Sequence, residues 1–425
     1  MTHDTITHVH AWEALDSRGR PTVACRVTLA GGAEGRAIAP SGASTGRHEA
    51  LEQRDGGERY AGWGVQGAVR AVNEEYAPIL RGRQASNRVA IDTEIEAHDG
   101  TDNLGRLGAN AALAVSLAVT VAHAQAENEP LWSTLRGPRP ASIPMPMVNI
   151  LSGGAHAGRA VDIQDFLAVP LGAASFTEAI EQVARVRASC AKLLDARGGW
   201  SALVADEGGL AARLDSNEAV LALLAEGIEA AGFATGEMAI ALDIAATQLV
   251  DGDDIVLAGQ GERLSVGEWL DLVALWIDRY PVVSVEDVVG EDDWDGSRTA
   301  TARFPGVQML GDDHFATNLV RVQRGLRESS ANAVLVKVNQ AGTVTRAERV
   351  VHEAIGGGFE TVVSARSGDT EDSWLADLAV GWGARQIKVG STMRSERTAK
   401  WNRLLELESD GTLPFAGRAA LAGQS

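Results

Sequence analysis

Lysine is scarce in this chain of 425 residues, because only four of its 38 basic residues are lysine. Two of the four, Lys337 and Lys388, end short apolar runs (AVLVKVN and RQIKVG), which predicts that both are buried. Arginine stays charged, whereas a lysine that is desolvated or close to other cations can lose its proton and act as a base. Lys337 and Lys388 are therefore the first candidates for chemistry, one to remove a proton and one to neutralise an anion.

Basic residues are also too few to balance the acidic ones, and the net charge is −19. This charge argues against nucleic acid or an anionic membrane as the main partner. It leaves an anionic small molecule open, since a bound metal can reverse the local sign of the field. No run of 18 apolar residues occurs and the first residues contain no apolar signal core, so we expect a soluble cytoplasmic protein.

Cysteine is nearly absent, which excludes a disulfide framework. Cys25 and Cys190 lie far apart and show no metal-ligand spacing. We expect both to be reduced and structural, as in a cytosolic protein.

Residues 1–140 have the pattern of a small α+β domain. The stretches ITHVHAWEAL and PTVACRVTLA alternate as strands do and are separated by the turn DSRGR. A loop rich in small residues follows, PSGASTGRHEA, and two helices are predicted over about 65–82 and 107–128. The proline-rich segment RGPRPASIPMP is expected to link this domain to the next.

Residues 141–425 show a repeated pattern of short apolar runs with helical stretches between most of them. The runs are MVNIL, DFLAVP, MAIALDI, VVSVED, VQMLGDD, AVLVKVN, TVVSAR and QIKVG. The last five recur about every 25 residues, the length of one strand–helix unit. Eight such runs predict a β/α barrel, whose active site lies at the carboxyl ends of the strands. A doubly wound open sheet is the alternative.

Acidic residues follow three successive runs of this pattern. Asp243, Glu286 and Asp312 stand at matched positions, which predicts a site of hard oxygen ligands suited to Mg²⁺. The neighbouring Asp287 and Asp313 are expected to cap a helix or to support the metal ligands, and not to bind the metal themselves. An acidic residue after a strand is often only a helix cap.

Cations follow the next three runs. Lys337 ends the sixth, Arg366 and Ser367 come after the seventh, and Lys388 ends the eighth. Carboxylates and lysines at one barrel mouth indicate a metal-bound anionic substrate with a lysine base. The alternative is that the lysines only extend to solvent.

These residues lie in stretches that resemble enolase, and the resemblance covers nearly the whole chain. Matching stretches include ALDSRGRPTV, PSGASTGRHEALEQRD, PMPMVNILSGGAHAG, SVEDVVGEDDWDG, LGDDHFATN, VKVNQAGTVT and IKVGSTMRSERTAKWNRLLELE. The resemblance implies an α/β fold, a (β/α)8 barrel of enolase type and unusual strand order with an N-terminal α+β capping domain. It also implies a lyase that uses two Mg²⁺ ions, removes the α-proton of 2-phosphoglycerate and expels its hydroxyl to give phosphoenolpyruvate.

The resemblance assigns roles residue by residue. Lys337 would be the base, with its pKa lowered by nearby cations, and Glu207 the acid that assists departure of hydroxide. The first Mg²⁺ would be held by Asp243, Glu286 and Asp312, and the second by Ser44 in the GAST loop. Substrate would be bound by His156, Asp165, Arg366, Ser367 and Lys388. A homodimer built through the N-terminal domain is also implied.

Two departures from the family pattern fall inside this implied site. The family motif close to SHRSGET appears here as SARSGDT, so that Ala365 stands in place of a histidine and Asp369 in place of a glutamate. Asp165, in IQDF, likewise replaces a glutamate. Ala365 and Asp165 both remove volume beside the substrate.

Three interpretations stay open. The chain is a working enolase, or a specialised paralogue that acts on a phosphorylated or phosphonylated carboxylate, such as one making carboxyphosphonoenolpyruvate in phosphonate biosynthesis. The third interpretation is a non-catalytic binding protein with an enolase fold.

Overall fold

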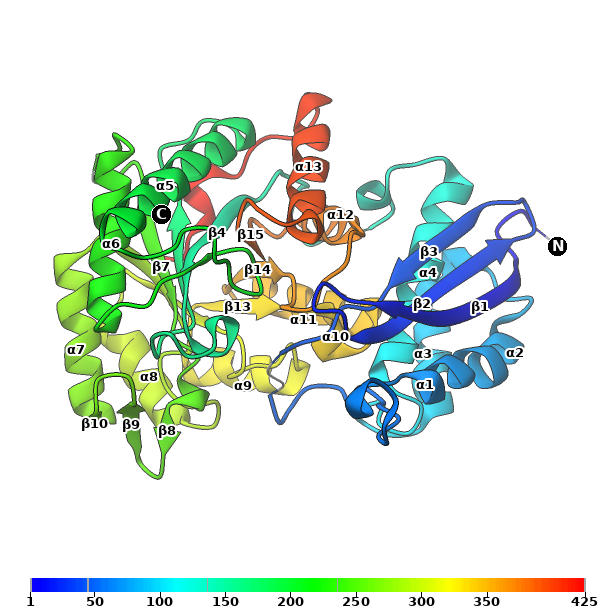
Figure 1. The fold of residues 1–425 in the computed structure, drawn as a ribbon. Helices are drawn as coiled ribbons and strands as arrows, with labels where there is room; N and C mark the ends of the chain where they lie inside the picture. Colours follow the sequence, from blue (N-terminus) through cyan, green and yellow to red (C-terminus); the bar gives the residue numbers. More distant parts are fainter. Residues whose placement is uncertain (1, 44–45, 136, 235, 424–425) are drawn as a thin grey trace.

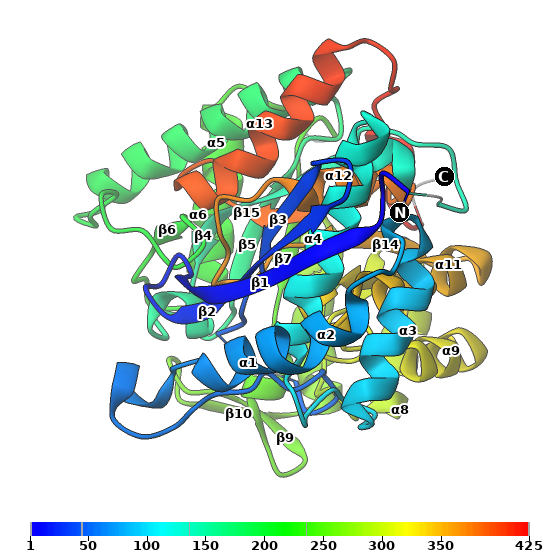
Figure 2. The same cartoon turned by 90° about the vertical axis from the view of Figure 1, so that its right-hand side faces the viewer.

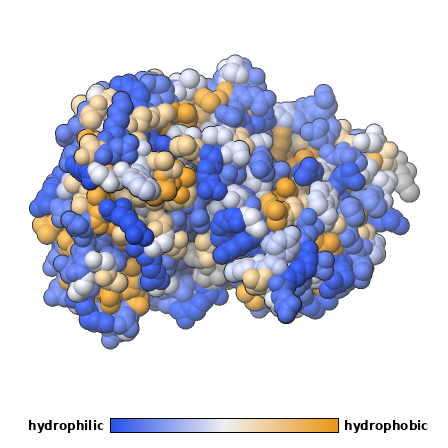
Figure 3. Space-filling view, viewed as in Figure 1, coloured by the Kyte–Doolittle hydropathy of each residue, from blue (hydrophilic) through white to orange (hydrophobic). Residues whose placement is uncertain are grey.

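A computed structural model describes residues 2–43, 46–135, 137–234 and 236–423. It has two lobes, an N-terminal α+β domain and a larger β/α barrel (Figure 1). Hydrophilic residues dominate the face shown in Figure 3, and hydrophobic ones are scattered over it. This surface agrees with the strongly acidic composition.

The N-terminal domain is a three-stranded antiparallel sheet packed on helices. Its strands are β1 (Ile6–Leu15), β2 (Pro21–Leu29) and β3 (Glu34–Ile38), and its helices are α1 (Gln66–Arg70), α2 (Ala77–Leu80), α3 (Arg88–Asp99) and α4 (Ala109–Glu127). A π-helical turn over Ala71–Tyr76 joins α1 to α2, so the predicted helix over 65–82 forms with an irregular centre. Strand β3 and helix α3 have no counterpart among the elements predicted from the sequence.

Helix α4 is the core of this domain and is apolar nearly all round. It packs under β2 and β3, and Figure 2 shows it behind the sheet. By length and composition α4 is the one helix among the described residues that could cross a membrane. Most of it is buried inside the protein, so its apolar surface is accounted for by packing.

Eight strands form the barrel, and all eight predicted runs are strands. They are β4 (Met145–Ser152), β5 (Asp165–Val169), β7 (Ala239–Asp243), β11 (Val282–Glu286), β12 (Gln308–Gly311), β13 (Ala333–Val336), β14 (Glu360–Ser364) and β15 (Gln386–Gly390). Strand β15 pairs with β4, which closes the sheet, so the open-sheet alternative is wrong. A two-residue strand, β6 (Leu210–Ala211), pairs beside β4.

Helices surround the barrel. They are α5 (Phe176–Ala196), α6 (Asn217–Ala230), α7 (Val266–Arg279), α8 (Trp294–Arg303), α9 (Leu319–Glu328), α10 (Val338–Ala341), α11 (Val344–Gly356), α12 (Trp374–Gly381) and α13 (Ser395–Ser409). Several begin at capping residues; Ser265, for example, forms a capping box with Glu268 at the start of α7. A separate small sheet of β8 (Val250–Asp251), β9 (Asp254–Leu257) and β10 (Glu262–Ser265) extends from one side.

Strand β5 runs in the opposite direction to the other barrel strands. It is antiparallel to both β4 and β7, and Asp165 at its start is the register partner of Asp243 at the end of β7. The expectation that every site residue stands at the carboxyl end of a strand is therefore wrong for Asp165. Because the strand is reversed, its amino end lies at the same mouth.

The two lobes are held together by buried polar contacts as well as apolar packing. Asp92 of α3 accepts hydrogen bonds from the Thr345 backbone N–H at 3.0 Å and from its hydroxyl. Arg88 pairs with Glu348 at 2.8 Å. The proline-rich segment also rests on the barrel, since Arg139 pairs with Glu360 at 2.7 Å. These contacts fix the N-terminal domain over one end of the barrel.

The close approach of β3 to α4 generates a stability prediction. A Cβ added at Gly35 would lie 2.1 Å from the carbonyl oxygen of Ala118, a backbone atom that cannot move aside. We expect Gly35→Ala to lower the free energy of unfolding by about 3 kcal/mol through overpacking. At Gly267 in α7 an added Cβ meets nothing within 4 Å, so Gly267→Ala should stabilise by about 0.5 kcal/mol. Chemical denaturation of both variants measures the difference, and equal midpoints would contradict the packing described.

Candidate active site

Three carboxylates converge at the barrel mouth from adjacent strands. Asp243 and Glu286 are register partners at the ends of β7 and β11, and Asp312 follows β12. All three are buried, with 2–5% of each residue exposed. The structure therefore brings together the three predicted metal ligands in the described part of the chain; Ser44 lies outside the described residues.

The two lysines that end strands are inserted among these carboxylates. Lys388 Nζ donates to Asp243 Oδ2 and to Glu286 Oε2, both at 2.7 Å. Lys337 Nζ donates to Asp312 Oδ2. The alternative in which the lysines extend to solvent is therefore wrong, because Lys388 is 5% exposed and Lys337 pairs inside the mouth.

Pairing shifts the proton affinities of these groups. Burial lowers the pKa of Lys388, but the facing charges of Asp243 and Glu286 outweigh it and raise the pKa well above its ordinary value. Burial likewise lowers the pKa of Lys337, and Asp312 outweighs it, so that this pKa is also raised. The expected lowering of the Lys337 pKa is thus reversed in this arrangement, because the group that Lys337 faces is an anion.

One oxygen of the acidic cluster lacks a partner. Glu286 Oε1 is buried and accepts no hydrogen bond from any described residue. Burial and the neighbouring charge of Asp243 raise the pKa of Glu286 well above its usual range. A hard cation would satisfy this oxygen and relieve the repulsion between the carboxylates. The residues therefore fit Mg²⁺, with Asp243, Glu286 and Asp312 as the groups that would hold it.

Asp287 supports the site from behind, as its expected capping role requires. Its carboxylate accepts backbone N–H bonds from Asp312 at 3.0 Å and from Asp313 at 2.7 Å. Asp287, Asp312 and Asp313 also form a group whose oxygens could hold an ion. Burial and the charge of Asp312 raise the pKa of Asp313 to about 7. Because Asp287 is already occupied by backbone donors, it positions the Asp312 loop.

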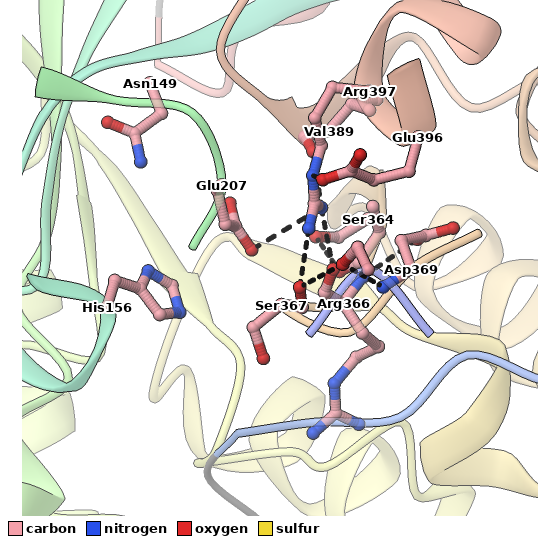
Figure 4. Close-up of polar contacts among 12 residues, drawn as sticks. Asn149, His156, Glu207, Ser364, Arg366, Ser367, Asp369, Val389, Glu396 and Arg397 are labelled. Atoms are coloured by element: carbon pink, nitrogen blue, oxygen red, sulfur yellow. Dashed lines mark hydrogen bonds and ion pairs between the residues drawn. The ribbon is translucent and has the colours of Figure 1, made fainter. Parts of the chain in front are cut away.

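Arg366 and Ser367 leave β14 on the opposite side of the mouth, and both are buried. Arg397 of α13 holds this turn: its guanidinium donates to the carbonyl oxygens of Arg366 and Ser367, each at 2.7 Å, and of Val389 at 2.9 Å (Figure 4). Sequence reasoning did not single out Arg397, although it lies in the quoted stretch MRSERTAKW. Arg397 is completely buried, but nothing in the sequence distinguishes it from helical arginines that lie on the surface.

Lys400 is buried, lies beside Arg397 in α13 and supports the same turn. Its Nζ donates to Asp369 Oδ1 and to the Thr370 carbonyl oxygen, both at 2.6 Å. Asp369 is therefore paired with a buried cation.

Glu207, the predicted proton donor, lies in a second group of residues at the mouth, together with His156 and Asp165. His156 Nδ1 lies 2.8 Å from Asp165 Oδ2, and Ser152 donates to Asp165 Oδ1 at 2.8 Å. Glu207 Oε1 lies 3.8 Å from Arg397 Nη1, and Figure 4 shows Glu207 between His156 and the Arg366 turn. These three residues are close enough that they too could hold a metal ion.

Ala365 immediately precedes Arg366 in the chain. It is buried at the end of β14, and its N–H donates to the Lys388 carbonyl oxygen at 2.9 Å. The backbone there is therefore tied to β15, and the side chain contributes no polar group to the site.

These features define a class of protein: a closed β/α barrel with a capping domain and a mouth where two lysines pair with a cluster of carboxylates. Comparison with known families agrees, because the model for the enolase N-terminal domain matches residues 6–135. The model for the enolase C-terminal TIM barrel domain matches residues 140–424. The chain belongs to the enolase family and is a lyase of the enolase superfamily, a group that typically binds Mg²⁺.

The His156–Asp165 pair gives a pH-dependent prediction. Burial lowers the pKa of His156, but the charges of Asp165 and Glu207 outweigh it and raise the pKa to about 9. The stability that protonated His156 contributes should be present at about pH 6.5 and should be lost as pH rises through about 9. Burial raises the pKa of Asp165, so the pair is also lost in acid when this carboxylate is protonated. Asp165→Asn should bring the pKa of His156 down to or below its ordinary value. NMR titration of the histidine signals tests this, and an unchanged His156 pKa in Asp165→Asn would contradict it.

The partnerless oxygen of Glu286 gives a prediction on metal binding. Glu286→Gln should weaken Mg²⁺ binding by about tenfold or more, since it replaces a charged oxygen ligand by a neutral amide. Glu291→Gln is the matched control, because Glu291 is equally buried on the following loop but pairs with Arg47. Titration calorimetry with Mg²⁺ compares the two. Equal affinity in both variants would show that the acidic mouth is not the metal site.

Proposed function

We propose that this protein is a Mg²⁺-dependent hydro-lyase that removes the α-proton of a 2-phosphoglycerate-like carboxylate and eliminates the β-substituent. The product is a phosphoenolpyruvate-type enol. The proposal rests on one observation above all: Lys337 and Lys388 pair inside one mouth with Asp243, Glu286 and Asp312. Such a mouth combines a base with charges that compensate a growing anion.

Proton removal is assigned to Lys337. A proton next to a carboxylate is weakly acidic, so cations must be in place before it leaves. When bound, Mg²⁺ would stabilise the charge that develops on the substrate carboxylate. Asp312 would then no longer raise the pKa of Lys337, whose neutral amine takes the proton. Lys388, with its raised pKa, stays cationic and pairs with the carboxylate.

Elimination is assigned to the opposite wall. Glu207 donates a proton to the departing hydroxyl, which leaves as water, and His156 orients the same end of the substrate. Arg366 and Ser367 bind the phosphate or phosphonate. Arg397 holds the turn that carries Arg366 and Ser367, and it also lies next to Glu207. The distance between the bound anion and the proton donor is therefore fixed.

A specialised paralogue is the second candidate, and Ala365 and Asp165 favour it. Both residues are smaller than those of the family motif, and both lie on the elimination side or next to it. A substrate with a bulkier or differently charged β-substituent would suit that side, as in the formation of carboxyphosphonoenolpyruvate. The non-catalytic interpretation is less well supported, because buried charges are costly and a binding protein has no need to keep them at this mouth.

The division of roles can be tested with 2-phosphoglycerate, Mg²⁺ and D₂O. Lys337→Ala should lose both exchange of the α-proton and formation of the enol, by about a thousandfold. Glu207→Gln should keep exchange and lose elimination. Lys192→Ala, at an exposed lysine, should behave as wild type. NMR follows exchange, and ultraviolet absorbance follows the enol.

Three outcomes separate the interpretations. Exchange without enol formation in the wild type would favour the specialised paralogue. No exchange with any phosphorylated three-carbon acid would eliminate the catalytic interpretation. Wild-type exchange in Lys337→Ala would show that another group is the base.

A further inference from the structure

The anion-binding arginine already pairs with a carboxylate from the N-terminal domain. Arg366 Nη1 donates to Glu49 Oε2 at 3.0 Å, and Nη2 lies 3.4 Å from Glu49 Oε1. The two residues are 4% and 5% exposed. Glu49 thus occupies the Nη1–Nη2 edge of the guanidinium, which is an edge that a phosphate or phosphonate binds in a bidentate manner.

Glu49 is held in this position by donors on two elements. Its Oε1 accepts from the Gly46 N–H at 2.9 Å and from Gln340 Nε2 at 3.3 Å. Gln340 Nε2 also donates to Asp312 Oδ1 at 3.0 Å, which connects Glu49 with the acidic mouth. The Glu49 carboxylate is therefore fixed next to Arg366 by its own hydrogen bonds.

Charge opposes the simultaneous presence of Glu49 and a ligand anion. The negative charges of Glu49, Asp312 and Glu52 all act on Arg366. A phosphate dianion that approaches Arg366 meets the Glu49 carboxylate in a buried setting, where like charges repel strongly. One of the two anions has to give up the shared edge.

We propose that Glu49 is an internal counter-anion that competes with the phosphate or phosphonate of the substrate for Arg366, and so sets the affinity of the site. Glu49 balances the charge of Arg366 when no ligand is bound, and gives up the shared edge when an anion arrives. Arg366 Nη1 also donates to Asn339 Oδ1 at 2.8 Å. The proposal uses from the proposed function only that an anion binds at Arg366. It needs no assumption about which reaction follows.

Inorganic phosphate is the direct probe, measured by titration calorimetry in the presence of Mg²⁺. Glu49→Gln should bind phosphate about tenfold more tightly than wild type, because the competing charge is gone while an amide oxygen still accepts from Arg366. Glu49→Asp, which keeps the charge, should gain less. In the Arg366→Met background the substitution Glu49→Gln should have no effect, since the shared partner is missing.

Glu291→Gln is the matched control. Glu291 pairs with Arg47 at 2.8 Å, so this variant removes an anchor of the same loop without touching Arg366. Its phosphate affinity should equal that of wild type. An equal gain in Glu291→Gln would overturn the proposal, because the gain would then come from loosening the loop.

Weaker phosphate binding by Glu49→Gln would also overturn the proposal, since Glu49 would then be a structural support of Arg366. Circular dichroism of each variant verifies folding before titration. The outcome is independent of turnover: a protein that does not convert 2-phosphoglycerate but binds phosphate more tightly as Glu49→Gln leaves this proposal standing. No phosphate binding by any variant would reject it.

Discussion

The constraint on which the rest of the structure depends is the compensation of buried charge at the barrel mouth. Lys388 pairs with Asp243 and Glu286, and the half-buried Lys337 pairs with Asp312. The three carboxylates and Lys388 are buried. Removing one partner from such a pair costs about 3–5 kcal/mol, because the other charge is left uncompensated. The mouth is therefore stable only when every lysine and carboxylate keeps a partner, and a ligand that enters has to change these pairings.

The barrel supplies the geometry that makes the set complete. Parallel strands place residues of the same register at one edge, which brings Asp243 next to Glu286. The reversed β5 adds Asp165 to that edge from the start of a strand. The turn after β14 supplies Arg366 and Ser367, and α13 fixes it through Arg397 and Lys400.

Much of this site could be predicted from the sequence, because its residues stand at strand ends and a strand end is visible as the end of an apolar run. Asp243, Glu286, Asp312, Lys337 and Lys388 were found in this way, and the eight runs predicted the barrel. The reversal of β5 could not be predicted, since the apolar pattern of a five-residue strand does not show whether the strand is parallel or antiparallel to its neighbours. Arg397 and Glu49 were also missed, because their importance comes from burial against a turn that is distant in sequence.

The direction of the Lys337 pKa shows a second limit. Sequence reasoning considered the cations that the family brings to the site, whereas the structure shows the carboxylate that Lys337 faces. The sequence and the structure agree on which residues form the site. They differ on the charge nearest to Lys337, which is a cation in the expectation and the Asp312 carboxylate in the structure. The chemistry proposed for Lys337 therefore depends on a cation that engages Asp312.

The scarcity of lysine makes this claim directly measurable, because a chain with four lysines gives four lysine side-chain signals in a selectively labelled NMR spectrum. The signals can be assigned by single substitutions and followed through a pH titration with and without Mg²⁺. We expect Mg²⁺ to shift the Lys337 and Lys388 signals, to lower the pKa of Lys337 and to leave the Lys192 signal unchanged. A Lys337 pKa that is the same with and without saturating Mg²⁺ would contradict the proposal that Mg²⁺ bound at the acidic mouth converts this lysine into a base.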